Sequence, residues 1–419
     1  MTGLDRTAVT LGNGVRVVYA SDPVAPVAAV HVRAEVGSRD ERAGRSGFAH
    51  LFEHLMFAAT TRLAGGDHIR AIETAGGFAN AQTLVESTSY FQTIPSPAAP
   101  MAVWLEAGRF ARLPDGVDAQ ILDQQREVVR NEWRDAVLST PYGDARNAVT
   151  AAMYPAPHPF NQTPTGEIGD LDGATVDDAL DFFADHYVPG RLVVAVVGRF
   201  DRALVEDEVE RGFGALRVGR TAVARPPADC VAVPDELVRV ERRSAAPPNL
   251  VVAHRLPPVG RVAFAAAELT VAVLATGQAS RLQRRLRRDT ALAANIQIKV
   301  MPMIAGDSMA IVRLRPVAGI DTAHLEAAYL DQLAVLAADG PTDEELRRAQ
   351  AQCLAGWLAA VERPRALAEE LTRDWMAWGE PRPPGEGVRR VLAVTAADVR
   401  ACAAALLHRR RVTLTYHST

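Results

Sequence analysis

The chain has 419 residues, of which 48% are apolar and 23% are charged, values typical of globular proteins with sizeable cores. This length exceeds one ordinary domain and fits two. The net charge of −4 comes with no basic stripe, and no run of 18 apolar residues occurs, so we expect neither a nucleic-acid partner nor a membrane span. No basic region followed by an apolar one is visible at the N-terminus, so we expect a cytoplasmic protein.

The first half of the sequence mixes short strand-like segments with longer helix-like ones. Runs rich in β-branched and aromatic residues predict strands at 7–19, with a hairpin signal at 12–14, and at 27–36, 81–94 and 192–197. Apolar periodicity predicts helices at 48–58, 67–74, 98–112, 118–138 and 176–186. This mixture indicates an α+β domain.

A Pro-rich stretch with little periodicity, 218–234, reads as a linker to a second block. In that block we predict strands at 238–241 and 249–255. We predict helices at 264–274, 280–288, 322–338, 343–360, 364–378 and 396–407. The similar order of elements indicates an α+β fold of two homologous domains, 1–217 and 235–419. Each is a mostly antiparallel sheet covered by helices, and the two face each other across a cleft.

A five-residue motif, His50-Leu51-Phe52-Glu53-His54, lies in the helix predicted at 48–58. Residues four apart share one face of a helix, so both imidazoles can bind one zinc ion. Glu53 lies beside such a metal without binding it, which is where a general base must be. Zinc lowers the pKa of a bound water toward about 7, so the motif predicts a catalytic Zn²⁺ centre. The alternative is a chance meeting of these residues.

A third protein ligand is expected in the helix predicted at 118–138, where two acids compete. Glu132 shares a face with Gln125, Val128 and Val129, which we interpret as the core-facing side. Glu127 falls among exposed charges. A buried carboxylate needs a reason such as a metal, so we choose Glu132 and keep Glu127 as the alternative.

The motif at 50–54 and the segment that contains Glu132 resemble those of the pitrilysin family of zinc peptidases, which carry the inverted HxxEH motif. The family includes insulin-degrading enzyme, the mitochondrial processing peptidase and bacterial two-domain peptidases. The resemblance rests on stretches that cover the first half of the chain. They are GFAHLFEHLMF, QREVVRNEW, AGGFANAQTLVESTSYFQTIP, YPAPHPF and FFADHYVPGRLVVAVVGRFD. It continues more weakly into the second half through ASRLQRRLRRD.

The resemblance implies a site in the first domain. His50, His54 and Glu132 would be the zinc ligands and Glu53 the base, while Gln125 stands where the family often has a second glutamate. It also implies that an extended peptide adds as a strand along 80–83, with Asn80 and Ala81 at its main chain. For Asn80 the alternative is a turn residue after Gly76-Gly77.

The second domain, without a metal site of its own, departs from the family pattern. Active members often carry an arginine and a tyrosine seven residues apart, and the matching frame here is Arg287 and Ala294. An alanine cannot donate the hydrogen bond of a phenol. We therefore expect a homologous partner subunit that supplies the pair, with a homodimer or monomer as the alternative. The basic stretch around Arg287 contacts substrate or forms a solvated face.

Together these observations predict a zinc metalloendopeptidase that cleaves extended peptides bound by strand addition in the inter-domain cleft, as the catalytic subunit of a heterodimer. One alternative is a maturation peptidase that removes the leader from one dedicated precursor. The other is a non-catalytic scaffold of the same fold, although intact ligands and base argue against it.

Overall fold

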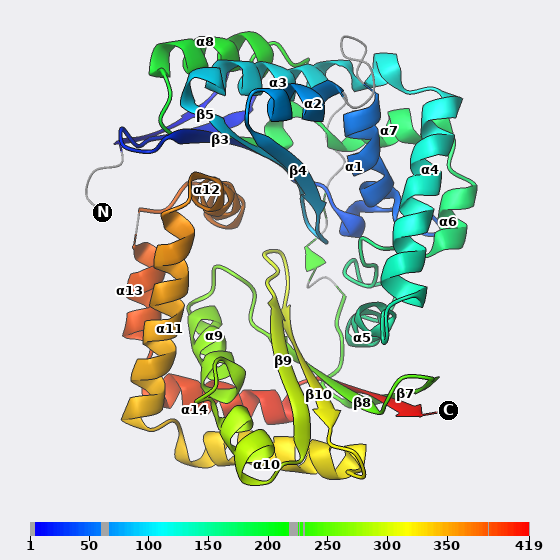
Figure 1. Ribbon diagram of the computed structural model, residues 1–419, viewed down its shortest axis with the longest axis vertical. Coiled ribbons are helices and arrows are strands. Elements are labelled where there is room, and N and C mark those ends of the chain that lie inside the picture. Colours follow the sequence, from blue (N-terminus) through cyan, green and yellow to red (C-terminus); the bar gives the residue numbers. More distant parts are fainter. Residues whose placement is uncertain are drawn as a thin grey trace. The chain divides into compact units, whose positions relative to one another are not determined.

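The structure, a computed structural model, describes residues 5–59, 67–217, 225, 227–228, 231–383 and 385–418. The chain forms two compact units, each built around one sheet (Figure 1). The first unit comprises Met1–Arg134, Gln162–Arg225 and Ala359–Pro383. The second comprises Asp135–Asn161, Pro226–Leu358 and Pro384–Thr419.

The first unit contains a six-stranded mixed sheet. Its strands run in the spatial order β1 (Asp5–Thr10), β2 (Arg16–Ser21), β6 (Leu192–Gly198), β3 (Val27–Ala34), β5 (Thr88–Pro95) and β4 (Phe78–Thr83). All neighbours are antiparallel except β2 and β6, which are parallel. Strand β6 is buried along its whole length, which explains its uninterrupted apolar sequence. Strand β4 forms one edge of the sheet.

Helices cover both faces of this sheet. On one face lie α1 (Phe48–Ala58), α3 (Ala99–Gly116), α7 (Val176–His186) and α8 (Arg202–Gly212), and on the other lies α12 (Pro364–Trp378) (Figure 1). Strand β3 shows why both layers are needed. Its residues Val30 and Val32 belong to the core under α1 and α3, while Arg33 donates to Thr372 of α12 at 3.2 Å.

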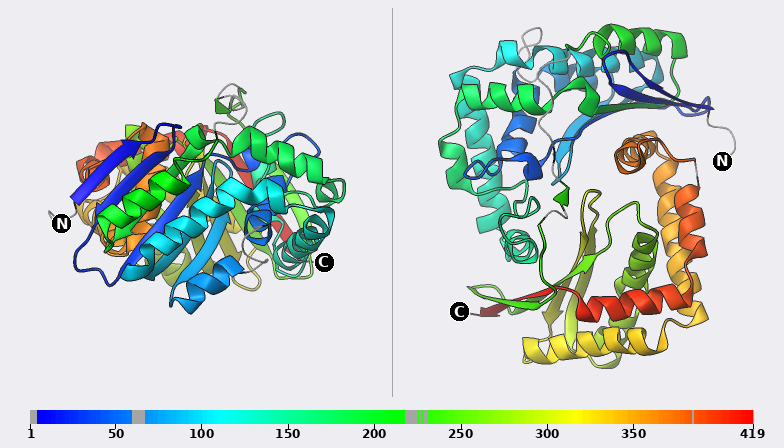
Figure 2. Two further views of the ribbon diagram at one scale, coloured as in Figure 1. Left: turned by 90° about the horizontal axis from the view of Figure 1, so that it is seen from above. Right: turned by 180° about the vertical axis from the view of Figure 1, so that it is seen from behind.

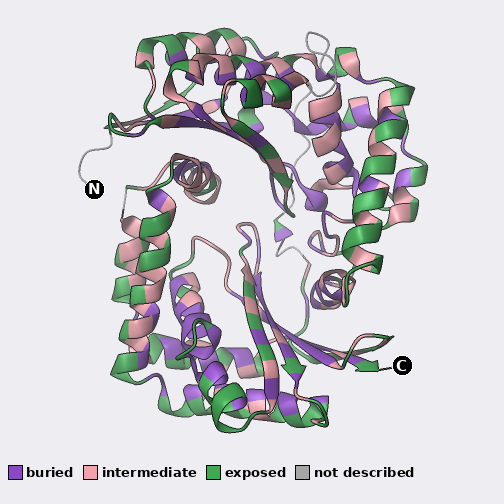
Figure 3. Cartoon of the chain, viewed as in Figure 1, coloured by how far each residue is buried: buried purple, intermediate pink, exposed green. Residues whose placement is uncertain are grey.

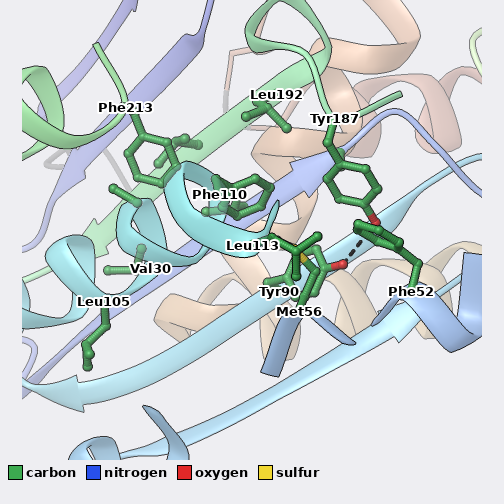
Figure 4. Close-up of a cluster of buried hydrophobic side chains, with 14 of the residues drawn as sticks. Val30, Phe52, Met56, Tyr90, Leu105, Phe110, Leu113, Tyr187, Leu192 and Phe213 are labelled. Atoms are coloured by element: carbon green, nitrogen blue, oxygen red, sulfur yellow. Dashed lines mark hydrogen bonds between the residues drawn. The ribbon is translucent and has the colours of Figure 1, made fainter. Parts of the chain in front are cut away.

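An aromatic cluster anchors α1 to the sheet (Figure 4). Phe52 packs on Tyr187 with ring centroids 4.6 Å apart. Tyr187 and Tyr90 of β5 share a hydrogen bond of 2.9 Å between their buried hydroxyls. Phe110 of α3 meets Tyr90 edge to face at 5.6 Å. Phe52, which lies between the two histidines of the motif, is therefore anchored in the core, and this fixes the rotation of α1 about its axis.

The second unit contains a five-stranded sheet with a related plan. Its order is β7 (Leu237–Ser244), β11 (Arg411–Ser418), β8 (Asn249–Leu256), β10 (Ser308–Pro316) and β9 (Ala293–Met301). Strands β7 and β11 are parallel, and the other neighbours are antiparallel. In chain order and pairing, β7 to β11 repeat β2 to β6 of the first sheet, so β9 corresponds to the edge strand β4.

Helices of the second unit enclose its core. Those that pack on it are α9 (Val262–Ala275), α10 (Thr322–Asp339) and α14 (Ala396–His408), and α10 and α14 lie side by side (Figure 2). Helix α5 (Ala145–Met153) contacts β11 and β8. Further helices are α2 (Asp67–Thr74), α4 (Ala119–Trp133), α6 (Ile168–Asp172), α11 (Asp343–Val361) and α13 (Glu386–Ala393). Among the described helices none is by itself long and apolar enough to cross a membrane. Only the pair α13 and α14, bent by 83°, reaches that length and composition together.

The α+β prediction is confirmed, with two sheets that are mixed and mostly antiparallel. The strands of the first sheet all precede residue 217, and those of the second all follow residue 235. Two helical segments, 135–161 and 359–383, nevertheless belong to the unit of the other sheet. Of the predicted linker 218–234, most residues lie outside the described ranges. The predicted domain boundaries stay a prediction.

A buried histidine of the second unit predicts acid sensitivity. Burial lowers the pKa of His254 to about 4, with Arg411 adding to the effect and the Leu406 carbonyl opposing it. The neutral ring fits its site, because one nitrogen lies 2.8 Å from the Tyr329 hydroxyl and the other 3.3 Å from the Leu406 carbonyl. Between pH 4 and pH 6.5 the unfolded chain binds more protons at this residue than the folded one, so stability falls on acidification.

We expect this single residue to remove up to about 3 kcal/mol of unfolding free energy between pH 6.5 and pH 4. Denaturant unfolding at several pH values, on the native protein and on His254→Gln, measures it. The variant should be less stable at pH 7 but should lose less on acidification. Parallel pH curves for the two proteins would contradict this assignment.

Candidate metal centre

The start of α1 is held by carboxylates from outside the helix. Glu41 accepts hydrogen bonds from the backbone N–H groups of Gly47 and Ala49, at 3.0 and 2.8 Å. Asp170 accepts from the backbone and hydroxyl of Ser46, at 3.0 and 2.7 Å. These acceptors satisfy N–H groups that a helix leaves unpaired. The first turn, which carries the first motif histidine, is thereby fixed.

Replacing Glu41 by alanine should therefore loosen the metal-binding helix. We expect a loss of about 2 kcal/mol in unfolding free energy, because two N–H groups lose their acceptor, together with weaker zinc binding. Denaturant unfolding and zinc competition with a chelator measure both effects. Glu73→Ala, at an exposed glutamate of α2, is the matched control. Equal behaviour of the two variants would show that Glu41 does not position the helix.

The imidazoles of His50 and His54 and the carboxylate of Glu132 converge between α1 and α4. Their Nε2 atoms lie 3.4 Å apart, and each lies 3.5 Å from Oε2 of Glu132. Tetrahedral zinc ligands at about 2.0–2.1 Å from the ion lie about 3.3–3.4 Å from one another, so these three atoms fit one zinc ion. Within the described ranges no other group of His, Cys, Asp or Glu side chains is close enough to hold a metal.

The reason given for choosing Glu132 was wrong, although the residue does meet the histidines. Its side chain is 50% exposed, and Val128 is exposed as well. The buried face of α4 is narrow and consists of Leu122 and Val129. Glu132 reaches the histidines because α4 packs against α1, not because it faces the core. Glu127 is 57% exposed and pairs with Arg130 at 2.9 Å.

Glu53 lies beside these ligands on α1, where its carboxylate accepts a hydrogen bond from the hydroxyl of Thr83 in β4. The pKa of Glu53 is raised to about 7, chiefly by burial and also by the nearby Glu132 carboxylate, while the Thr83 hydrogen bond and Arg109 act in the opposite direction. A carboxyl group with this pKa can take up and release a proton near neutral pH. Thr83 was missed as a supporting residue, although it shares a strand face with Ala81 by the two-residue period.

A hollow of about 570 Å³ opens beside Glu53 and His54. It is lined by residues of α1, α2, β4 and α4, among them Phe57, Asn80 and Gln125. The structure therefore gathers the predicted base, a predicted ligand and two of the predicted neighbours around one open space of a size that accepts a side chain of a peptide.

Asn80 and Ala81 belong to the edge strand β4, which pairs with β5 and with no other described strand. Asn80 is thus a strand residue rather than a turn residue. Its side-chain oxygen accepts from the backbone N–H of Ala81 at 2.7 Å. An edge strand presents unpaired backbone groups, which an added strand can bind.

Arg287 and Ala294 lie in the second unit. Arg287 is exposed on a π-helical turn, Gln283–Asp289, and Ala294 sits at a register shift where β9 meets β10. The predictions for the basic stretch fail at Arg281, which is neither solvated nor free for substrate. It is buried and makes two hydrogen bonds to Glu345, at 2.8 and 2.7 Å.

Comparison with known proteins agrees with this geometry. Residues 16–158 match the family described as insulinase (peptidase family M16), and residues 173–353 match the peptidase M16 inactive domain. A Mycobacterium leprae protein named an uncharacterized zinc protease is 28% identical over 97% of this chain and 90% of its own length. The zinc protease PqqE of Helicobacter pylori is 32% identical over 50% of this chain and 47% of its own.

Among solved structures, a protease from Helicobacter pylori superposes with a TM-score of 0.90 at 23% identity, over 99% of both chains, so the fold is shared. The two matched domains and the full-length relatives named zinc proteases lead to one conclusion: this chain belongs to the insulinase (M16) peptidase family, in its two-domain bacterial branch.

Proposed function

We propose that this protein is a zinc-dependent endopeptidase that cleaves extended peptides. The observation that carries the proposal is the convergence of His50, His54 and Glu132 to zinc-ligand spacing next to Glu53, whose pKa is raised to about 7. Relatives named zinc proteases support it. A Zn²⁺ ion held by these three residues would polarise the scissile carbonyl and a neighbouring water molecule.

The residues of the chain supply the other parts of the reaction. The free edge of β4 binds the main chain of an extended peptide through backbone hydrogen bonds, so affinity depends little on the peptide's side chains. Glu53 takes a proton from the attacking water and gives it to the leaving amine. The Thr83 hydroxyl keeps the Glu53 carboxylate turned toward the reacting groups. Asn80 exchanges its bond to Ala81 for one to the substrate main chain.

The test combines metal analysis with peptide cleavage. The purified chain should contain one zinc ion per molecule and should cleave internally quenched peptides. A chelator should stop cleavage and added zinc should restore it. A chain without zinc and without cleavage would instead favour a non-catalytic scaffold. Cleavage of a single precursor from a peptide library would favour the leader-removing alternative.

A second, narrower proposal concerns subunits. Ala294 occupies the position where the family pattern has a tyrosine, so we propose that a homologous partner supplies the arginine–tyrosine pair in a heterodimer. Co-expression of the chain with a homologue that lacks the zinc motif should raise cleavage well above that of the chain alone. Full cleavage by the chain alone, as a monomer or homodimer, would overturn this proposal and leave the peptidase function intact.

A further inference from the structure

The only lysine of the chain occupies an unusual place. Of 46 basic residues, 45 are arginines and one is Lys299. Lys299 lies on β9, the edge strand of the second sheet, and its side chain is exposed. Because β9 corresponds in pairing and chain order to β4, which carries the predicted peptide-binding edge, its surroundings bear on what the second sheet can bind.

Two arginines of β10 share a sheet face with Lys299. Lys299 pairs with Ile311, Gln297 with Arg313, and Asn295 with Arg315. Residues directly opposite in an antiparallel pair point to the same face. One face of this strand pair therefore carries Lys299, Arg313 and Arg315, which we call the basic strip. Exposed Gln297 and Asn295 lie on the same face, directly opposite Arg313 and Arg315, and Figure 3 shows the alternation of exposed residues along β9.

The opposite face of β9 is apolar and contributes to the core. Ile296, Ile298 and Val300 pack in or against the core cluster of the second unit. The strand cannot slip by one residue without burying Lys299, so the basic strip is held on its side of the sheet.

The three cations of the basic strip have no acidic partner among the described side chains. Some arginines of this unit do have acidic partners: Arg255 lies 3.0 Å from Asp307, and Arg281 lies 2.7 Å from Glu345. Tyr416 and Tyr142 lie within electrostatic reach of Arg313 and Arg315, and Tyr416 donates to Asp144, the nearby carboxylate. Asp144 also lies 3.7 Å from Arg242. Asp144 is thus held by Tyr416 and Arg242, and the three side chains of the basic strip carry positive charges that can attract an anion.

The edge position decides which anion fits. A strand added to β9 lies about 4.8 Å from it, and its side chains on one face recur about every 6.7 Å. Acidic side chains at alternate positions of the added strand would thus lie along the basic strip. Lys299 is on β9, next to the added strand. Arg313 and Arg315 are one strand further away, on β10, and their long side chains can extend past Gln297 and Asn295 toward the added strand.

We propose that the basic strip binds acidic side chains of an extended peptide added to the β9 edge, so that this protein prefers acidic peptide segments. The preference for substrates rests on the proposed peptidase function, but the binding itself does not. Backbone pairing supplies affinity, and Lys299, Arg313 and Arg315 supply selectivity.

The experiment measures binding separately from cleavage. Fluorescence anisotropy of three labelled peptides of equal length, with glutamate, glutamine or lysine at alternate positions, is recorded on the full chain carrying Glu53→Gln. The acidic peptide should bind at least about 10-fold more tightly than the neutral one at low salt, and the difference should shrink as salt is raised. Cleavage of the same peptides by the native protein is measured in parallel.

A triple variant, Lys299→Gln with Arg313→Gln and Arg315→Gln, should lose the preference. The control removes three other exposed arginines of the second unit, by Arg243→Gln, Arg347→Gln and Arg400→Gln, and so has the same net charge. It should keep the preference. Lys299→Glu is a single exposed change that does not disturb the core. This variant should bind the acidic peptide less tightly, and the lysine peptide more tightly, than the native protein does.

The outcomes separate the two proposals. Equal affinities of the native strip for all three peptides, or an equal loss in the control variant, would overturn the basic strip as a selective site. Tighter binding of a single-stranded oligonucleotide than of the acidic peptide would overturn the assignment of a peptide as its occupant. Selective binding without any cleavage would leave the strip intact and contradict the peptidase function.

Discussion

Replacing Glu53 by glutamine is expected to abolish peptide cleavage while zinc stays bound. Glutamine fills the same space on α1 and can still contact Thr83, so the histidines and Glu132 keep their positions. It cannot take up a proton, however, and a general base contributes about 10²–10⁴ to rate. We expect kcat to fall by about 10²- to 10⁴-fold, with zinc content unchanged. Stopped cleavage assays and metal analysis of one preparation measure both quantities.

Glu127→Gln is the matched control for this change. It removes a carboxylate of α4 that is 57% exposed and paired with Arg130, so its kcat should stay within about two-fold of native. Substantial activity in Glu53→Gln would mean that another group acts as the base, and loss of zinc in that variant would mean that Glu53 supports the metal directly.

Substitution of Glu132 by glutamine should remove zinc. The carboxylate oxygen of Glu132 lies 3.5 Å from both imidazole nitrogens and is the only anionic donor among the three. An amide is a much weaker zinc ligand than a carboxylate, so we expect zinc affinity to fall by more than about 100-fold and cleavage to fall with it. Competition with a fluorescent chelator measures the affinity.

The same measurement on Glu127→Gln decides between the two acids that the sequence left in competition. Native affinity there, with weak binding in Glu132→Gln, is the expected pair of results. The reverse pair would transfer the ligand role to Glu127 and would require α4 to turn about its axis.

Much of the site could be predicted because it depends on local spacing. Helical geometry alone places His50 and His54 on one face with Glu53 beside them. Glu132 was the right neighbour for an incorrect reason, because a helical wheel cannot tell that α4 buries little more than Leu122 and Val129. The Thr83 contact depends on how β4 passes α1, which no local pattern reveals.

The fold, like the site, was predicted in its local features and missed where it depends on distant contacts. Strand 249–255 was predicted from its continuous apolar run, but β9, β10 and β11 were missed. In β9 the alternation typical of a half-buried strand is confined to Ile296–Val300, and the residues before it are Ala and Asn, which are rare in strands. The placement of α12 could not be predicted either, because it depends on contacts such as those of Thr372 with Arg33 and His31, more than 300 residues away in sequence.

The exchange of segments between the two units has a consequence for how such a chain can be divided. The backbone passes from one unit to the other five times, at 134, 161, 225, 358 and 383. A gene fragment ending at residue 217 would encode every strand of the first sheet yet omit α12, the layer over His31 and Arg33. Although the two sheets repeat one plan, neither half is a self-sufficient piece. Any duplication that produced the two sheets must therefore have been followed by an exchange of helical segments, because each unit now contains chain from both halves of the sequence.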